Sequence, residues 1–179
     1  MIRLLDIIFS FLSLILFFPL FILILFVGFF DTGLPLFIQK RVGLNLKNFT
    51  LIKFRTMKIG ALSAGTHLID LSNITCFGYL LRKFKLDELP QLLNVLMGHL
   101  SIVGPRPCLP NQKRLIIERK KRGIFKVKPG ITGLAQISGI NMKTPTLLAK
   151  TDLKMINKMN LYSYFYYILY TLLLILKNK

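Results

Sequence analysis

Residues 7–30 read IIFSFLSLILFFPLFILILFVGFF, an uncharged run of 24 residues that lies between Asp6 and Asp31. A helix of this length can cross a hydrocarbon core of roughly 30 Å. Pro19 stands near its middle, and proline kinks a helix, although membrane helices tolerate it. Two arrangements agree with this run: a single span, and a helix that bends at Pro19 and returns to the face it entered.

Positive charge flanks the run on both sides, with Arg3 before it and several basic residues between Lys40 and Lys58 after it. Basic residues favour the cytoplasmic side of a membrane, so this distribution favours the re-entrant arrangement. A cleaved signal peptide is not expected, because the run is too long and no small-residue cleavage site follows. We therefore expect a membrane anchor over residues 1–31 and a cytoplasmic domain over residues 32–179.

The composition suits a protein that meets both lipid and anions. Hydrophobic residues make up 53% of the chain, and 25 basic residues against 7 acidic ones give a formal net charge of +18. The positive electrostatic field of such a chain favours binding of anions, such as phospholipid head groups, nucleotide diphosphates, polyprenyl phosphates or nucleic acid. Cys76 and Cys108 have no metal-ligand spacing and form no dense cysteine framework, which indicates a reducing compartment.

The remaining sequence predicts a small, helix-rich domain of the α/β (α+β) class with interfacial amphipathic helices. Apolar and polar residues alternate over residues 34–57 around Gly43-Leu44-Asn45, which predicts a β-hairpin. The tyrosine-rich segment near the end suits an interfacial helix or a core helix close to the membrane. Helical spacing of apolar residues predicts helices at residues 78–84, 89–97, 111–122 and 161–176.

Three segments between these elements are rich in glycine, proline or small polar residues. Residues 59–76 are expected to form a loop without regular structure. Residues 98–110 contain three prolines and should be a rigid connection that forms no regular element. Residues 128–139 are expected to be another glycine-rich turn.

One adjacent acidic pair, Asp87 and Glu88, stands out among the seven acids. The pair should lie at a helix start with Pro90 in the first turn, where acids often serve only to stabilise the helix end. Here Arg82, Lys83 and Lys85 lie just upstream. Nearby cations should keep the pKa of Asp87 low and the carboxylate available as a nucleophile or metal ligand. The neighbouring carboxylate suits a divalent cation or proton transfer.

Several basic motifs suit phosphate binding. Pro105 and Pro107 fix the backbone around Arg106, which pre-organises the guanidinium for a bidentate phosphate contact, although an exposed arginine in a turn is the alternative. Lys53 and Arg55, and the segment of residues 128–133, add cations and glycine-exposed amides. The sequence has neither GxxxxGK[ST] nor GxGxxG, so it lacks the usual motifs of nucleotide-binding folds.

Together these segments resemble the monotopic phosphoglycosyl transferases, bacterial sugar transferases that begin polysaccharide or glycan assembly on undecaprenyl phosphate. The resemblance is nearly full length and follows the order and spacing of the family. It rests on the anchor and on IQKRVG (38–43), FTLIKFRTM (49–57), LLRKFKLDELPQLLNVLMG (80–98), LSIVGPRP (100–107) and KPGITGLAQISG (128–139).

The resemblance implies a re-entrant anchor and a two-step transfer of a sugar phosphate. In the family, the aspartate that matches Asp87 attacks the β-phosphate of the donor, releases UMP and forms a covalent phosphosugar ester that polyprenyl phosphate then cleaves. The glutamate that matches Glu88 assists with Mg2+, so both carboxylates are candidate metal ligands. Phosphate or substrate binding is expected of Lys53, Arg55, Arg82, Arg106 and Gln136.

The expected partners follow from the same resemblance. They are a UDP-sugar donor, expected to be N-acetylated, and undecaprenyl phosphate in the bacterial inner membrane, with no nucleic acid. The pathway is expected to be exopolysaccharide or lipopolysaccharide O-antigen synthesis, and a homodimer and a monomer both agree with the sequence.

The chain departs from the family at residues that bear on the donor. Ile140 replaces an arginine that many members carry, which removes a phosphate contact. Ala135 stands where tryptophan is usual, and His99 where an acid is common. These departures predict a different sugar pocket, and they motivate the alternative of a catalytically degenerate protein or a non-enzymatic basic module that binds membranes.

Overall fold

The computed structural model describes residues 1–61 and 71–177. The apolar run forms two helices, α1 (Ile2–Leu16) and α2 (Phe18–Thr32), which meet at a bend of 64°. Pro19 lies in the first turn of α2, where a missing backbone donor costs nothing, so the break falls at Phe17. Within the described ranges, no single helix has the length and apolarity to cross a membrane, whereas this bent pair has both. The kink is confirmed, and re-entry stays a prediction.

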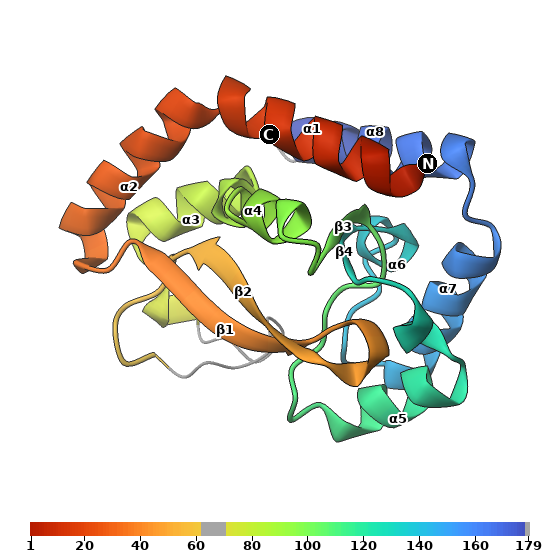
Figure 1. The fold of residues 1–179 in the computed structure, drawn as a ribbon. Coiled ribbons are helices and arrows are strands. Elements are labelled where there is room, and N and C mark those ends of the chain that lie inside the picture. The colour runs from red at the N-terminus through yellow and green to blue at the C-terminus, as the bar shows by residue number, and fades with distance from the viewer. Residues whose placement is uncertain (62–70, 178–179) are drawn as a thin grey trace.

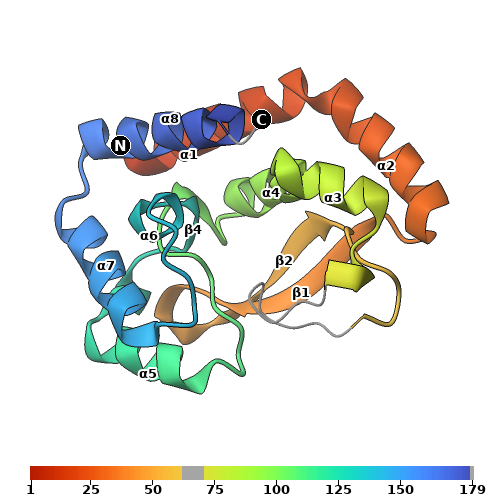
Figure 2. The same cartoon turned by 180° about the vertical axis from the view of Figure 1, so that it is seen from behind.

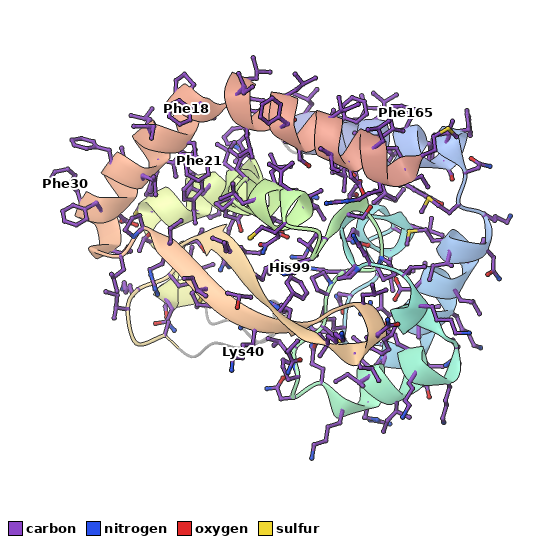
Figure 3. All side chains as sticks on the ribbon, in the orientation of Figure 1. Phe18, Phe21, Phe30, Lys40, His99 and Phe165 are labelled. Atoms are coloured by element: carbon purple, nitrogen blue, oxygen red, sulfur yellow. The ribbon has the colours of Figure 1, made fainter. Side chains whose placement is uncertain are left out.

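The last helix, α8 (Leu161–Lys177), lies beside α1 in both views (Figures 1 and 2). The rings of Phe9 and Phe165 meet edge to face with centroids 5.9 Å apart. Figure 3 shows Phe18 and Phe30 directed away from the body of the protein. We call the outer side of α1, α2 and α8 the apolar face, and its exposed side chains include Phe11, Leu12, Leu16, Phe18, Phe26, Phe30, Leu169, Leu172, Leu173 and Leu176.

The predicted hairpin is confirmed by two antiparallel strands. Strand β1 (Leu36–Val42) pairs with β2 (Asn48–Phe54) in a register that runs from Leu36 opposite Phe54 to Val42 opposite Asn48. The alternation buries Phe49 and Leu51 in a cluster with Val95 and Leu100, as the period of two requires.

The predicted helices around the acidic pair are present, but the pair lies between them. Helix α3 (Cys76–Lys83) ends before Lys85, which adopts a left-handed conformation with φ of 54°. Residues Leu86–Glu88 form a separate 3-10 turn, and α4 (Gln91–Leu96) begins after Pro90. The ring of Pro90 would clash with the carbonyl of residue 86 in a continuous α-helix. The expectation that the pair opens the helix at 89–97, with Pro90 in its first turn, is therefore corrected.

A second small sheet forms where the sequence predicted irregular structure. Strand β3 (Ser101–Val103) pairs in parallel with β4 (Gly130–Thr132), and the short helix α6 (Leu134–Ile137) follows. The predictions for residues 98–110 and 128–139 are wrong in these parts, because three-residue strands are too short to show alternation. A side chain on Gly130 would collide with the backbone of Gly104, so glycine permits this close pairing.

The remaining helices close the far side of the domain. Helix α5 (Lys113–Lys121) confirms the prediction for residues 111–122, whereas α7 (Pro145–Asn157) was not predicted. The core between them contains Val42, Cys108, Leu115, Ala135 and Leu148. Of the loop predicted at residues 59–76, residues 62–70 lie outside the described residues, and Leu71–Asn73 form a 3-10 turn.

A buried carboxylate joins helices α1 and α8 to the second sheet. Asp6 on α1 accepts hydrogen bonds from Ser101 Oγ (2.8 Å), from the amide of Ile102 (2.9 Å) and from the hydroxyl of Tyr164 on α8 (2.9 Å). Its side chain is almost fully buried, and a buried charge requires such partners. Nearby, Arg3 donates to the carbonyls of Val95 and Leu96 at the end of α4.

Asp6→Asn is expected to lower the free energy of unfolding by about 3 kcal/mol, because an amide cannot accept all these bonds and buried donors lose their partner. Thermal unfolding in detergent measures the change. The matched control is Asp31→Asn, since Asp31 accepts an exposed hydrogen bond from Thr75 and its loss should cost under about 1 kcal/mol. Equal losses in the two variants would contradict an anchoring role for Asp6.

Candidate active site

The acidic pair meets two cations that come from distant parts of the chain. Strand β2 supplies Lys53, whose Nζ lies 2.8 Å from Glu88 Oε1. The segment after β3 supplies Arg106, whose NH2 lies 2.9 Å from the same oxygen. The fold thus brings together four of the residues predicted from sequence, at one partly buried site.

Asp87 is held much more loosely than Glu88. Its Oδ2 lies 3.9 Å from Lys53 Nζ, and within the described ranges no hydrogen bond to its carboxylate is found. The side chain is nevertheless only 14% exposed. A partly buried carboxylate without a donor keeps its oxygens available for a ligand.

The electrostatic surroundings shift the pKa values of the two carboxylates in opposite directions. Burial raises the pKa of Asp87, and the attraction of Lys53 only partly opposes this effect. Burial alone would also raise the pKa of Glu88, but the ion pairs with Lys53 and Arg106 hold it far below its usual range. The expectation of a low pKa for Asp87 is therefore wrong, because its burial outweighs the attraction of the nearby cations, of which Lys53 and Arg106 pair with Glu88.

Of the other predicted phosphate-binding residues, Arg82 lies near the acidic pair and Arg55 lies away from it. Arg82 Nε donates to Thr56 Oγ1 at 2.8 Å, and its charge acts on Asp87. Arg55 instead donates to the carbonyls of Leu34 and Leu36. Its phosphate contact stays a prediction, since the structure holds this side chain against the start of β1.

Gln136 belongs to a cavity next to Arg106. Its Nε2 donates to the carbonyl of Gly104 at 3.2 Å, and its buried Oε1 has no partner within the described residues. The cavity has a volume of about 230 Å³. Its wall is formed by Lys85, Arg106, Ala135, Gln136, Gly139, Ile140, Asn141, Met142 and Leu148. Two of the three departures from the family, Ala135 and Ile140, therefore line the space beside Arg106.

A buried ion pair that the sequence did not indicate supports Arg106. Arg119 on α5 contacts Asp152 Oδ2 on α7 through NH2 at 2.7 Å and Nε at 3.0 Å. Its NH1 donates to the carbonyl of Arg106 at 2.8 Å. Both side chains are almost fully buried. The only available signal was that Asp152 is one of seven acids, and its partner lies 33 residues away.

A second arginine missed from the sequence, Arg41, lies close to the same segment. Its NH1 donates to the carbonyl of Pro107 at 3.1 Å, and its NH2 donates to Gln39. Burial and the charge of Arg106 lower the pKa of Arg41 to about 10. The motif IQKRVG contained this arginine, but alternation alone did not distinguish it from the other basic residues of the hairpin.

The residues at the pair fit a Mg2+ ion only in part. Over the described residues, no cluster of at least three His, Cys, Asp or Glu side chains is present. Mg2+ commonly binds one or two carboxylates and takes its other ligands from substrate phosphates and water. Asp87, which accepts no hydrogen bond from the described residues, and the second oxygen of Glu88 suit that pattern.

Comparisons with known proteins show the family to which this chain belongs. The family model described as bacterial sugar transferase matches residues 1–178. The uncharacterized sugar transferase EpsL of Bacillus subtilis is 54% identical over 110 residues, which cover 61% of this chain and 54% of EpsL. The exopolysaccharide production protein ExoY of Rhizobium meliloti is 36% identical over 160 residues, which cover 76% of this chain and 68% of ExoY.

A third relative is named for a reaction. The UDP-glucose:undecaprenyl-phosphate glucose-1-phosphate transferase of Escherichia coli is 43% identical over 122 residues, which cover 64% of this chain. The matches span about half of EpsL and 26% of the Escherichia coli protein. The family match over nearly the whole length confirms the resemblance inferred from the motifs: this chain belongs to the bacterial sugar transferase family.

Proposed function

We propose that this chain transfers a sugar 1-phosphate from a UDP-sugar to undecaprenyl phosphate and thereby starts synthesis of a bacterial polysaccharide. The observation that carries the proposal is the contrast between the two carboxylates. Glu88 is fixed by Lys53 and Arg106, while Asp87 is partly buried with its oxygens unbound by described donors. Relatives from Xanthomonas campestris and Escherichia coli carry this reaction in their names.

In the first step, a carboxylate oxygen of Asp87 attacks the β-phosphorus of the donor. The bond from that phosphorus to the bridging oxygen breaks, UMP leaves with the electron pair, and a phosphosugar ester of Asp87 remains. The guanidinium of Arg106 has donors beyond the one used by Glu88 and is placed to bind phosphate oxygens. Lys53 and Arg82 add positive charge near Asp87.

In the second step, a phosphate oxygen of undecaprenyl phosphate attacks the same phosphorus. The bond to Asp87 breaks, the carboxylate is regenerated, and the product is an undecaprenyl diphosphate sugar. Mg2+ held by Asp87 and Glu88 would neutralise charge on the diphosphate. The cavity that contains Gln136 and Ile140 lies beside Arg106 and suits the part of the donor beyond its phosphates.

UMP release from purified protein in nanodiscs tests the proposal. The assay contains undecaprenyl phosphate, Mg2+ and one donor at a time: UDP-glucose, UDP-galactose or an N-acetylated UDP-hexosamine. The N-acetylated donor is our prediction from the sequence, whereas the Escherichia coli relative is named for glucose and one from Erwinia amylovora for galactose. Release of UDP instead of UMP would place the chain in another class of transferase.

Absence of turnover with every donor would favour the degenerate or membrane-binding alternative. In that case Ile140→Arg, which restores the cation common in the family, is the variant to test. Recovery of UMP release in this variant would identify a lost phosphate contact, and continued inactivity would favour the non-enzymatic module.

The bacterial inner membrane is the proposed location, with the domain of residues 32–179 in the cytoplasm. Single cysteines at Ile2 and Leu34, introduced with Cys76→Ser, mark the two ends of the bent helix pair. A re-entrant pair predicts labelling of both by a membrane-impermeant reagent from the cytoplasmic side of sealed vesicles. Labelling of either end from the periplasmic side would refute re-entry.

The rate of the first step should depend on the ionisation of Asp87. Only the carboxylate attacks, and burial raises the pKa of Asp87, so the rate should fall with decreasing pH before an ordinary aspartate would protonate, at about pH 4. Glu88 stays ionised in this range because its pKa is lowered. Single-turnover UMP release measured against pH tests this, and a constant rate down to about pH 4 would contradict it.

A further inference from the structure

Two cations converge at the end of α4, away from the acidic pair. Arg3 NH2 and Lys128 Nζ each lie 3.6 Å from the position that a Cβ atom would take on Gly98. Burial and the neighbouring charge of Arg3 lower the pKa of Lys128. Arg3 binds carbonyls of α4, whereas Lys128 has no ion pair within the described ranges. Two like charges held this close favour an anion between them.

The nearby carboxylate of Asp6 attracts Lys128 and partly opposes the lowering of its pKa, but it forms no ion pair with Lys128 within the described residues. Asp6 lines the same region, but its oxygens accept hydrogen bonds from Ser101, Ile102 and Tyr164. The carboxylate of Asp6 is therefore occupied by the hydrogen bonds that join α1, β3 and α8. The positive charge of Lys128 remains available to a ligand.

An apolar cavity of about 320 Å³ adjoins the two cations. It lies under the first turns of α1 and extends to α7. Its apolar lining includes Ile2, Met155, Ile156 and Met159, and the two residues before Arg106, Gly104 and Pro105, also line it. Methionine and aliphatic side chains adapt to a flexible hydrocarbon chain.

The cavity lies at the edge of the apolar face. An adjoining hollow contains Ile2 and Arg3 together with Leu161 and Tyr162, and these residues begin α1 and α8. Figure 2 shows that the two helices start at the same end of the molecule. A lipid that borders the apolar face at this end would place its phosphate level with the two cations.

The position of the two cations separates the proposed phosphate from the acidic pair. Arg3 binds the carbonyl end of α4, whereas Asp87 precedes the start of that helix. The six residues of α4 extend over about 9 Å. A phosphate between Arg3 and Lys128 would therefore lie too far from Asp87 to take part in the transfer.

We propose that Arg3 and Lys128 bind the phosphate of an anionic membrane phospholipid, with one acyl chain in the adjoining apolar cavity. Arginine and lysine supply several donors to phosphate oxygens, and the cavity accepts the hydrocarbon. This lipid would fix the first turn of α1 against the cytoplasmic domain. The inference rests on the membrane placement proposed above and does not depend on transfer activity.

Native mass spectrometry of the full chain in detergent tests the proposal by counting bound lipids during titration with phosphatidylglycerol. Lys128→Gln should weaken the first binding event about ten-fold, the loss of one charge-assisted contact. The matched control is Lys126→Gln, which removes the same charge from an exposed side chain two residues away and should retain wild-type affinity. Equal weakening in both variants would overturn a defined site.

A second variant tests the cavity without altering charge. Ile156→Phe should fill the space and weaken phosphatidylglycerol binding, and thermal unfolding verifies that the variant folds. Phosphatidylcholine and inorganic phosphate should each bind at least ten-fold more weakly, since one lacks net charge and the other lacks a hydrocarbon chain. Tighter binding of undecaprenyl phosphate than of phosphatidylglycerol, lost in Lys128→Gln, would overturn the phospholipid assignment. These outcomes are read from binding, so they stand whether or not UMP is released.

Discussion

Asp87→Asn should reduce UMP release at least about 10⁴-fold and leave the fold intact. An amide has no ionised oxygen with which to form the ester, so the loss falls on the chemical step. Because burial raises the pKa of Asp87, the folded state disfavours its charged form, and a neutral side chain should keep or increase thermal stability. A donor with a radiolabelled β-phosphate provides the direct measurement, since the wild type should retain covalent label and Asp87→Asn none.

Glu88→Gln is the matched control, and it should behave differently. It leaves Lys53 and Arg106 without the carboxylate that both contact, and breaking a buried ion pair typically costs about 3–5 kcal/mol. Activity and thermal stability should therefore fall together in this variant. UMP release that survives Asp87→Asn would remove Asp87 as the nucleophile, and unchanged stability in Glu88→Gln would contradict the structural part assigned to Glu88.

Asp152→Ala should destabilise the protein by about 3–5 kcal/mol, because it leaves the buried guanidinium of Arg119 without a counter-charge. Arg119 also donates to the carbonyl of Arg106, so displacement of Arg119 should disturb the phosphate-binding arginine. Urea unfolding in detergent and UMP release at saturating and limiting donor measure the two effects.

The double variant Arg119→Met with Asp152→Leu separates stability from positioning. Replacing both charges by apolar groups of similar volume should recover most of the stability that Asp152→Ala loses. UMP release at limiting donor should stay low, since the carbonyl of Arg106 still lacks its donor. Full recovery of both properties would show that Arg119 does not position Arg106.

The sequence predicted the elements in which apolar residues recur with the period of a strand or a helix. The alternation of the hairpin and the long apolar runs extends over enough residues to show the period of a strand or a helix. Strands β3 and β4 have three residues each, too few to show the period of a strand. Helix α7, with apolar and basic residues interspersed, was not predicted at all.

Four residues that the sequence indicated lie together at the candidate site, but their pairing was not predicted. The sequence pointed to Arg82, Lys83 and Lys85 as the cations that act on Asp87, because they lie nearest along the chain. The folded chain places Lys83 over the ring of Phe84 and Lys85 in the cavity beside Arg106. Lys53 and Arg106 come from distant segments and bind Glu88. The burial of Asp87 outweighs their attraction, which explains why the pKa expected for Asp87 was wrong. Long-range pairs such as Arg119 with Asp152 leave no local pattern.

The hydrogen bond between Asp6 and Tyr164 joins residues that are 158 positions apart. During synthesis Asp6 leaves the ribosome long before Tyr164, because nearly the whole chain lies between the two residues. Until then the α1 carboxylate lacks one of its partners, and burial of a charge without its partners is costly. Stable docking of α1 therefore depends on α8, and a nascent chain that ends before α8 should leave α1 loosely packed against the rest of the protein.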